Sequence, residues 1–227
     1  RKFLKTGLLG AASLALPSSW AQASDPPTAI FRADPPTPMV ALTFDDGYGY
    51  VTRFLDTCQE LNIRLTLFPL GKVIKAQPEL FQRALAEGHE IGCHGYQHIA
   101  LKGKSYDEIA AQLSKFLEVT QTYLGLSTVR YFRPPYGSGW ASPALQQAAA
   151  DFGMSVVMWN KPLTPGASDP KRTWRDVVGE FRKQAVSGDI FLYHFPYPDV
   201  AALPGIVSLC SERGWQVGTI SQLIGAA

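Results

Sequence analysis

The sequence predicts an α/β fold in which helices wrap a parallel sheet. From Met39 onward, short runs rich in β-forming residues alternate with helical stretches, and about seven such strand–helix units fit into the 227-residue chain. Strands joined by helices pair in parallel. We therefore expect a closed or nearly closed barrel, with the functional residues on the loops that follow the strands.

Each expected element follows from a local pattern. Residues 39–44 are apolar and bounded by turn residues, which predicts a buried strand. Pro78 opens and Gly88 closes one helix, and Ser105 with Glu108 forms a capping box at the start of a longer helix that Gly125 ends. The expected strands are 39–44, 64–69, 89–93, 131–132, 155–159, 190–193 and 215–217. The expected helices are 51–61, 78–87, 105–125, 142–152, 173–186, 200–213 and a short one from 220 onward.

Composition excludes some classes of protein. Hydrophobic residues make up 46% of the chain, which is enough to form a sizeable hydrophobic core. The formal net charge is only +2, so neither nucleic acid nor anionic lipid is expected as a partner. Three cysteines, Cys58, Cys93 and Cys210, are too few and too scattered for a disulfide framework. They allow one disulfide without indicating its pairing, and no C-x-x-C pair is present to form a thiolate zinc site.

The N-terminus predicts an export signal over residues 1–23. It has a basic start, an apolar stretch over 7–16 and an Ala-Gln-Ala cleavage site ending at residue 23. An uncleaved anchor is the alternative, but the apolar stretch is short for a membrane span, and no stable span is expected after cleavage. Residues 24–38 hold five prolines and predict an extended linker outside the fold, followed by a catalytic domain over 39–227.

The protein is therefore expected to be exported, either to the periplasm or as a secreted protein. The opening residues Arg-Lys-Phe-Leu-Lys resemble the second half of a twin-arginine signal. This resemblance leads to the hypothesis that an arginine precedes Arg1 and that the twin-arginine route exports the folded protein.

Two groups of polar residues follow predicted strands and suggest a metal site. Adjacent carboxylates such as Asp45 and Asp46 repel each other unless a cation offsets them, although the pair could instead cap the next helix. His94 and His98 would share one face if their loop made a helical turn. Together, Asp46, His94 and His98 form a two-histidine, one-carboxylate set, which is typical of catalytic zinc or another divalent ion.

Further candidates follow the fourth and sixth strands. In Arg133-Pro134-Pro135-Tyr136-Gly137 the prolines fix the backbone, and the permanent cation could pair with a carboxylate. His194 ends the run Leu192-Tyr193-His194. His89, which opens a strand, is expected to have a structural role as a hydrogen-bonding residue.

In this order, the motifs TFDDG, HGYQH, RPPYG and LYH, together with GHEIG, resemble the polysaccharide deacetylases of carbohydrate esterase family 4. This group is also described as the nodulation-type chitooligosaccharide deacetylase homology domain. The resemblance spans roughly residues 40–220 and implies a distorted, incomplete (β/α) barrel. It further implies a divalent metal, with zinc expected and cobalt or nickel as alternatives, and an acetylated polysaccharide or oligosaccharide as substrate.

The resemblance also implies a role for each matching residue. The implied metal ligands are Asp46, His94 and His98. The implied catalytic residues are Asp45 as general base, Arg133 as its orienting cation, the Tyr136 N–H as oxyanion donor and His194 as general acid. The implied substrate-binding residues are Pro134, Pro135, Tyr136, Trp159 and Leu192.

Several positions depart from the family pattern. Gly95 stands where a hydroxyl side chain usually supports the metal-binding histidine, so the metal is held more loosely or supported otherwise. Cys93 replaces an asparagine and is either an extra ligand or a buried small residue. Tyr48 replaces a proline. After Trp159 the aspartate that tunes the acid histidine is missing, and Asp169 is a candidate substitute.

The expected reaction is removal of N-acetyl groups from peptidoglycan, an exopolysaccharide or a chitin-type N-acetylglucosamine polymer, by metal-activated water. Two alternatives are weighed against it: an O-acetyl ester deacetylase of the acetylxylan type, and a catalytically silent sugar-binding module. Aromatic residues beside the motifs could stack on sugar rings or serve ordinary loop packing. They are Tyr48, Tyr50, Tyr96, Tyr136, Trp140, Phe195 and Tyr197.

Overall fold

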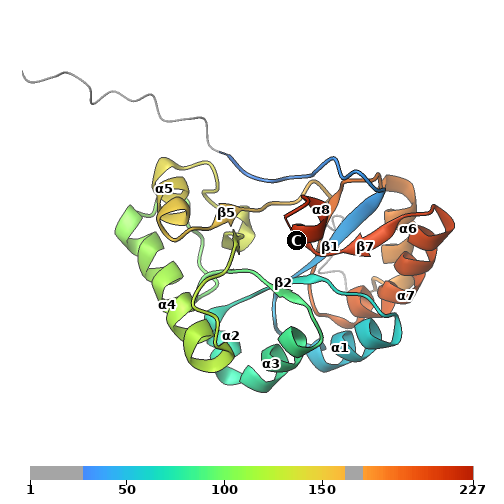
Figure 1. The fold of residues 1–227 in the computed structure, drawn as a ribbon, viewed down its shortest axis with the longest axis horizontal. Coiled ribbons are helices and arrows are strands. Elements are labelled where there is room, and N and C mark those ends of the chain that lie inside the picture. The colour runs from blue at the N-terminus through green and yellow to red at the C-terminus, as the bar shows by residue number, and fades with distance from the viewer. Residues whose placement is uncertain (1–27, 162–170, 227) are drawn as a thin grey trace, which may run out of the picture.

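The computed structural model describes residues 28–161 and 171–226, so the predicted export signal lies outside the described residues. Its main sheet has five parallel strands in the order β3-β2-β1-β6, with β7 also paired to β1 (Figure 1). The strands are β1 (Met39–Asp46), β2 (Thr66–Pro69), β3 (Glu90–Ile91), β6 (Ile190–Tyr193) and β7 (Gln216–Gly218).

Two further strands form a separate parallel pair, β4 (Tyr131–Phe132) and β5 (Ser155–Val156). One parallel bridge, Cys93 to Phe132, links this pair to the chain leaving β3. All the strand pairs found in the described part of the chain are parallel, but they fall into two sheets. The predicted fold class, a distorted and incomplete (β/α) barrel, is confirmed.

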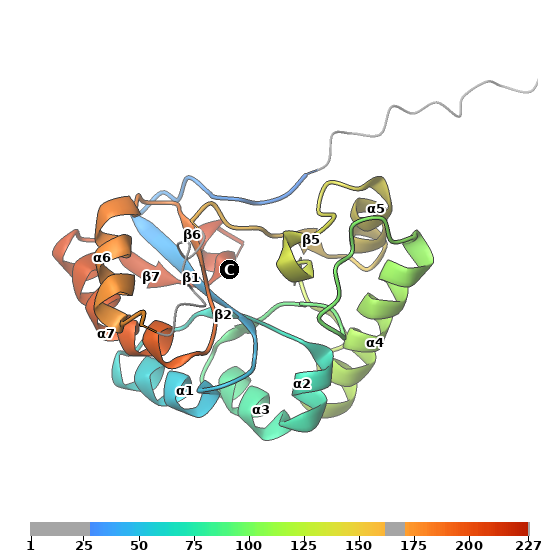
Figure 2. The ribbon, with the colours of Figure 1, turned by 180° about the vertical axis from the view of Figure 1, so that it is seen from behind.

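Helices α1 to α7 lie around the outside of the sheets (Figures 1 and 2). They are α1 (Val51–Glu60), α2 (Gly71–Ala76), α3 (Pro78–Ala86), α4 (Tyr106–Leu124), α5 (Pro143–Asp151), α6 (Trp174–Gln184) and α7 (Tyr197–Glu212). The short α8 (Ile220–Leu223) lies instead near β1, toward the middle of the molecule. The sequence did not predict α2, a helix of six residues. Three predicted strands are shorter than expected, since β2 covers four residues and β3 and β5 cover two each.

Local signals in the sequence account for the helix ends. The capping box predicted at Ser105 and Glu108 is formed in both directions, and Gly125 ends α4 in the left-handed conformation with φ of 72°. Thr173 and Asp176 form a second capping box, which begins α6. These contacts satisfy backbone N–H groups that a helix leaves without partners at its first turn.

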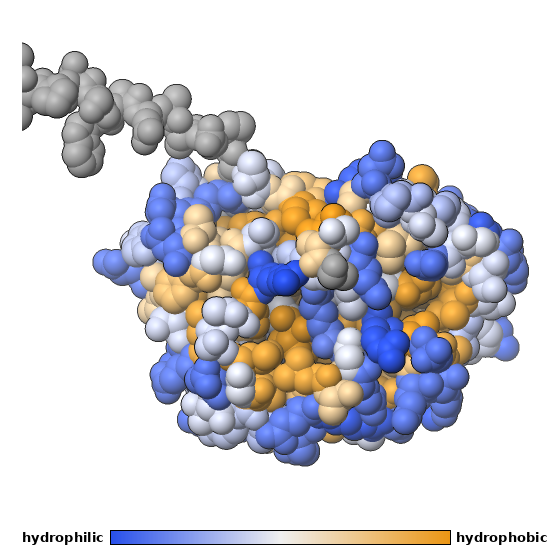
Figure 3. Space-filling model, in the orientation of Figure 1, coloured by the Kyte–Doolittle hydropathy of each residue, from blue (hydrophilic) through white to orange (hydrophobic). Residues whose placement is uncertain are grey.

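The core has two parts because successive residues of β1 point to opposite faces of the sheet. Val40, Leu42 and Phe44 belong to the larger cluster between sheet and helices. Met39 and Ala41 belong to a smaller cluster that includes Ile220 and Leu223 of α8. Residues 43 and 45 continue the second alternation, so Thr43 and Asp45 are directed to the side of the sheet away from the outer helices. Figure 3 shows apolar residues in the middle of one face of the molecule, with some hydrophilic residues among them and many along its margin.

The segment before β1 is extended, as its prolines predict, but it belongs to the fold. Ile30 N donates to Val156 O at 2.9 Å, and Ala33 N donates to Gly188 O at 2.9 Å. The expectation that residues 24–38 form a linker outside the fold is therefore wrong for the described residues, 28–38. Proline and polar composition do not prevent pairing where a sheet edge offers unpaired backbone groups.

The three cysteines are buried and free. Burial raises the pKa of the Cys58 and Cys93 thiols, and raises that of Cys210 to about 12, so their reactive thiolate forms are disfavoured. Cys93 is a buried small residue whose Sγ accepts a hydrogen bond from Gly95 N, and it is not part of the group formed by Asp46, His94 and His98. Among the described residues, no helix is both long and apolar enough to cross a membrane.

His89 has the structural role that the sequence predicts. Its ring is buried, and its Nδ1 accepts a hydrogen bond from Leu65 N at 3.2 Å. Burial lowers the pKa of His89 from its ordinary value of 6.5. As pH falls below 6.5, the unfolded chain therefore binds a proton that the folded chain still excludes, and stability falls until the folded pKa is passed.

We expect the free energy of unfolding, measured with urea, to decrease between about pH 7.5 and about pH 5 by about 1.4 kcal/mol for each unit by which the pKa is lowered. The His89→Asn variant keeps an acceptor for Leu65 N but has no titrating group, so its stability should change less over that range. An equal pH dependence in both proteins would contradict this role for His89.

Candidate active site and metal centre

The end of β1 directs two neighbouring carboxylates to different partners. Asp46 has a φ of 74°, in the left-handed region that non-glycine residues rarely adopt. Gly47 follows with φ of 89°, and a Cβ there would lie 2.9 Å from the Phe81 ring, so the turn requires glycine. Because the backbone turns sharply here, Asp45 contacts Arg133 while Asp46 faces two histidines.

Asp46, His94 and His98 converge as the sequence predicts. Asp46 Oδ1 lies 3.4 Å from His94 Nε2 and 3.3 Å from His98 Nε2, and ligand atoms of the three residues lie within 4.8 Å of one another. Asp46 Oδ1 is buried and has no hydrogen-bond partner among the described residues. A buried oxygen without a partner is costly, and a cation between these three side chains would satisfy it.

The two histidines meet without the helical turn that their spacing suggested. Residues 94–98 form an irregular loop with a bend, and the ring centroids of His94 and His98 lie 5.4 Å apart. His94 Nδ1 lies 2.7 Å from the carbonyl oxygen of Arg133, which fixes the proton on Nδ1 and leaves Nε2 free to bind a metal. This carbonyl orients the His94 ring, although residue 95 has no hydroxyl side chain. Gly95 itself has φ of 78°, which favours glycine.

The charges of the cluster also suit a divalent cation. Burial tends to raise the pKa of Asp46, but the proximity of His94 and the positive charges that His94, His98 and His194 can carry outweigh it and lower the pKa. Burial lowers the pKa of His98. Both shifts favour the ligand forms, an ionised carboxylate and a neutral imidazole. The residues present therefore fit a divalent metal ion, and the two-histidine, one-carboxylate set leaves open coordination positions.

Asp45 is held by a guanidinium that has no contact with solvent. The Arg133 side chain is 0% exposed, and its Nη1 donates to Asp45 Oδ1 at 2.8 Å and to Thr43 Oγ1 at 2.6 Å. Its other nitrogens donate to the carbonyl oxygens of Val157 at 3.2 Å and Met158 at 2.9 Å. These four hydrogen bonds fix the guanidinium, and the one to Asp45 holds that carboxylate in one orientation.

The loop from Arg133 to Gly137 carries a second strained residue. Pro134 and Pro135 are buried and shape the loop, while Tyr136 is 66% exposed and has φ of 60°. The hydrogen bonds that close this turn run from Gly137 N to Pro134 O and from Ser138 N to Pro135 O, so the Tyr136 N–H takes no part in them. The Tyr136 ring packs against His98, with centroids 4.2 Å apart.

The other two predicted substrate-binding residues, Trp159 and Leu192, lie near the end of β1. Trp159 packs beside Gly137, where a Cβ would come within 3.0 Å of its ring. Leu192 of β6 pairs in register with Thr43 of β1, and its side chain is partly exposed. Both residues therefore border the end of β1 that carries the carboxylates.

His194 follows β6 and is partly exposed. Its backbone N donates to Asp199 Oδ2 at 3.1 Å, and Asp199 Oδ1 in turn accepts from Arg172 at 2.8 Å. Asp199 is buried, so this pair anchors the backbone of His194 from beneath. Sequence reasoning missed Asp199, because one aspartate near a helix start has no distinctive pattern. The candidate Asp169 lies outside the described residues.

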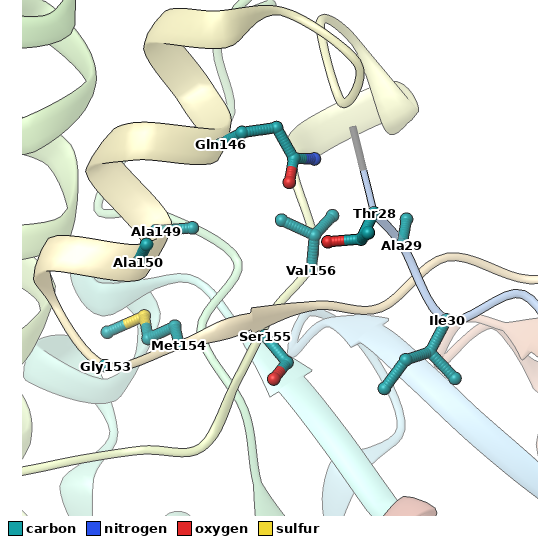
Figure 4. Close-up of a pocket in the computed structure, with 10 residues that line it drawn as sticks. All are labelled: Thr28, Ala29, Ile30, Gln146, Ala149, Ala150, Gly153, Met154, Ser155 and Val156. Carbon is teal, nitrogen blue, oxygen red and sulfur yellow. The ribbon is translucent and has the colours of Figure 1, made fainter. Parts of the chain in front are cut away.

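A pocket of about 460 Å³ lies elsewhere, between α5, β5 and the N-terminal segment (Figure 4). Gln146, Thr28 and Ser155 give it a few polar groups, and none of its lining residues titrates. None of the predicted site residues lines it, so we do not assign it to the candidate active site.

Comparison with known proteins agrees with this site. Residues 32–157 match the family model described as polysaccharide deacetylase. A peptidoglycan-N-acetylglucosamine deacetylase of Bacillus cereus is 30% identical over 202 residues, which cover 82% of this chain and 88% of that protein. The chain belongs to the polysaccharide deacetylase family. Its class is thus that of hydrolases acting on amide carbon–nitrogen bonds other than peptide bonds.

Other proteins similar to this chain differ in the activity that their names give. The peptidoglycan-N-acetylmuramic acid deacetylase PdaA of Bacillus subtilis is 29% identical over 188 residues, which cover 82% of this chain and 71% of that protein. Among solved structures, a family 4 pseudoenzyme from Bacillus anthracis has a TM-score of 0.79 and 28% identity, covering 87% of this chain and 69% of that one. A peptidoglycan N-acetylglucosamine deacetylase has a TM-score of 0.78 and 26% identity, covering 87% of this chain and 92% of that one.

Metal binding should stabilise the fold, because the three ligands converge only in the folded state. We expect zinc at about 100 times its dissociation constant to raise the free energy of unfolding by about 2.7 kcal/mol relative to chelator-treated protein. Thermal unfolding of the wild type and of His98→Ala, with and without zinc, measures this. The variant should gain much less, and an equal gain in both would place the bound zinc elsewhere.

Proposed function

We propose that the protein removes N-acetyl groups from an exported polysaccharide, with peptidoglycan, an exopolysaccharide or a chitin-type N-acetylglucosamine polymer as the substrate. The observation that carries the proposal is the convergence of Asp46, His94 and His98 beside Asp45, whose carboxylate is paired with buried Arg133. Relatives named as peptidoglycan deacetylases support the same reaction.

In the proposed mechanism, Asp46, His94 and His98 would hold a divalent cation, which when bound would supply a Lewis acid for the acetyl carbonyl and for the attacking water. Asp45 Oδ2 is the oxygen not occupied by the Arg133 hydrogen bond, and it lies 3.8 Å from His94 Nε2, on the side of the metal ligands. We assign to this oxygen the role of accepting the proton of the attacking water. The pairing with Arg133 fixes the orientation of the Asp45 carboxylate.

Other groups act on the opposite ends of the amide. The Tyr136 N–H, which the strained loop leaves out of its own hydrogen bonds, donates to the acetyl oxygen as negative charge develops there. His194 donates a proton to the departing nitrogen, since an amine leaves poorly without one. Leu192 and Trp159 border the space for the acetyl methyl group and the sugar.

We further propose that the protein is an active enzyme rather than a silent binding module, although a structural neighbour is named a pseudoenzyme. A module that only binds sugar has no need of an oxygen such as Asp46 Oδ1, buried without a hydrogen-bond partner among the described residues. An O-acetyl ester deacetylase stays the alternative, because the same groups would cleave the more reactive ester bond.

Zinc is the proposed metal, with cobalt or nickel as alternatives. Residues 1–23 are proposed as an export signal, 24–38 as the segment leading to the fold and 39–227 as the catalytic domain. The enzyme would then act in the periplasm or as a secreted protein, where its substrate is found.

Acetate release is the test of this function. We expect chelated protein to be inactive, and added zinc, cobalt or nickel to restore release from N-acetylglucosamine oligomers or peptidoglycan. Release from acetylxylan alone would favour the ester alternative. No release from any substrate, with zinc bound, would contradict the proposal.

The His194→Ala variant tests the general acid without disturbing the core, because the Asp199 anchor contacts the backbone of residue 194 and not its side chain. We expect kcat to fall by about 100- to 10,000-fold with an unchanged Tm. Asp45→Asn should lower kcat as well, but it leaves a buried guanidinium without its charge partner and should also destabilise the fold. Near-normal kcat in a folded His194→Ala protein would remove the residue from this role.

A further inference from the structure

Lys72 lies beside the metal-ligand loop and has no part in the chemistry described above. It is the second residue of α2, and its backbone N donates to Tyr96 O at 3.1 Å. The preceding Gly71 N donates to Gly95 O at 2.9 Å. Tyr96 stands midway between His94 and His98 in the sequence, so two hydrogen bonds fix the backbone of Lys72 against the loop that presents both metal ligands.

The side chain of Lys72 extends toward the residues that follow the catalytic carboxylates. Its ammonium lies 5.7 Å from the centroid of the Tyr48 ring, and Tyr48 comes two residues after Asp46. Both side chains are exposed, Tyr48 by 48%. The aromatic ring attracts the cation weakly and favours one position for it. The ammonium therefore stays near Tyr48, at the edge of the candidate active site, and remains open to solvent.

Among the described residues, Lys72 has no carboxylate partner of the kind that Lys104 and Lys115 have. Lys104 pairs with Glu108 at 2.8 Å and Lys115 with Glu118 at 2.7 Å. No carboxylate of the described residues forms an ion pair with Lys72. A cation in the first turn of a helix also opposes the helix dipole, so Lys72 does not stabilise α2. Its charge is thus available to a ligand.

We propose that Lys72 binds a carboxylate of the substrate, and that the preferred substrate is an N-acetylated sugar carrying a carboxylate next to its acetamido group. The lactyl ether of N-acetylmuramic acid has this arrangement, because the carboxylate hangs from the carbon adjacent to the one bearing the acetamido group. The inference rests on the proposed deacetylation and selects among its substrates. The relatives act, by name, on either sugar of peptidoglycan, so family membership alone leaves the choice open.

An exposed ion pair contributes modestly and is screened by salt. The expected effect is therefore a preference rather than an absolute requirement. We expect kcat/KM for glycan strands with free lactyl carboxylates to exceed that for the same strands with the carboxylates amidated by about 3- to 10-fold at low ionic strength. Raising the salt concentration should shrink this ratio.

The test compares Lys72→Gln with Lys75→Gln. Lys75 is exposed and lies in the last turn of the same helix, so it controls for loss of one positive charge on α2. Lys72→Gln should abolish the preference for carboxylated strands, mainly through KM, whereas Lys75→Gln should retain it. An undiminished preference in Lys72→Gln, or an equal loss in both variants, would overturn the proposal.

Binding measurements separate this inference from the proposed reaction. Titration calorimetry of carboxylated and amidated strands into the His194→Ala protein, with and without Lys72→Gln, needs no turnover. Lys72→Gln should remove any tighter binding of the carboxylated strands. If that result is obtained while the wild type releases no acetate, the deacetylation proposal fails and the carboxylate site stands. Equal binding of both strands with Lys72 present refutes the site, even in an active enzyme.

Discussion

The buried guanidinium of Arg133 is the constraint on which the rest of the site depends. A charge without solvent contact costs several kcal/mol unless it is paired and hydrogen-bonded. Arg133 offsets this cost by donating hydrogen bonds to one carboxylate, one hydroxyl and two backbone carbonyls. Its own carbonyl oxygen accepts the hydrogen bond from His94 Nδ1. One residue thus fixes the proposed general base and the orientation of one metal ligand, so moving either would leave a buried polar group without a partner.

The same residue explains how an incomplete barrel keeps its shape. The described strands fall into two sheets, joined near β3 by the bridge from Cys93 to Phe132. Arg133 follows β4, contacts the end of β1 and bonds to carbonyls just beyond β5. The side-chain hydrogen bonds of Arg133 therefore connect the two sheets at a place where their backbones do not pair. The packing of its guanidinium on Phe68, 4.2 Å from the ring centroid, ties in β2 as well.

Much of this arrangement was predictable because the informative residues directly follow strands. The alternation of strands and helices predicted a parallel sheet, and parallel strands bring Asp46, His94, Arg133 and His194 to one end of it. Features that depend on long-range packing were not predictable. Nothing local predicts α2, a six-residue helix that opens on glycine, or the pairing of the proline-rich segment with β5. The contact of Asp199 with the His194 backbone depends on how α7 packs, and the hydrophobic pattern of the sequence does not predict that packing.

Backbone strain gathers where the chemistry is proposed. Three non-glycine residues of the described chain have positive φ, and Asn62, a residue type that tolerates this conformation, lies in a turn. The other two, Asp46 and Tyr136, hold the proposed metal ligand and oxyanion donor. Each such residue costs about 1–3 kcal/mol, which the surrounding structure must offset. The hydrogen bond from Leu70 N to Asp46 O at 3.1 Å and the two buried prolines before Tyr136 hold these turns in place. Because relaxed turns would point the carboxylate and the N–H elsewhere, the strain is the structural requirement for aiming both groups at one point.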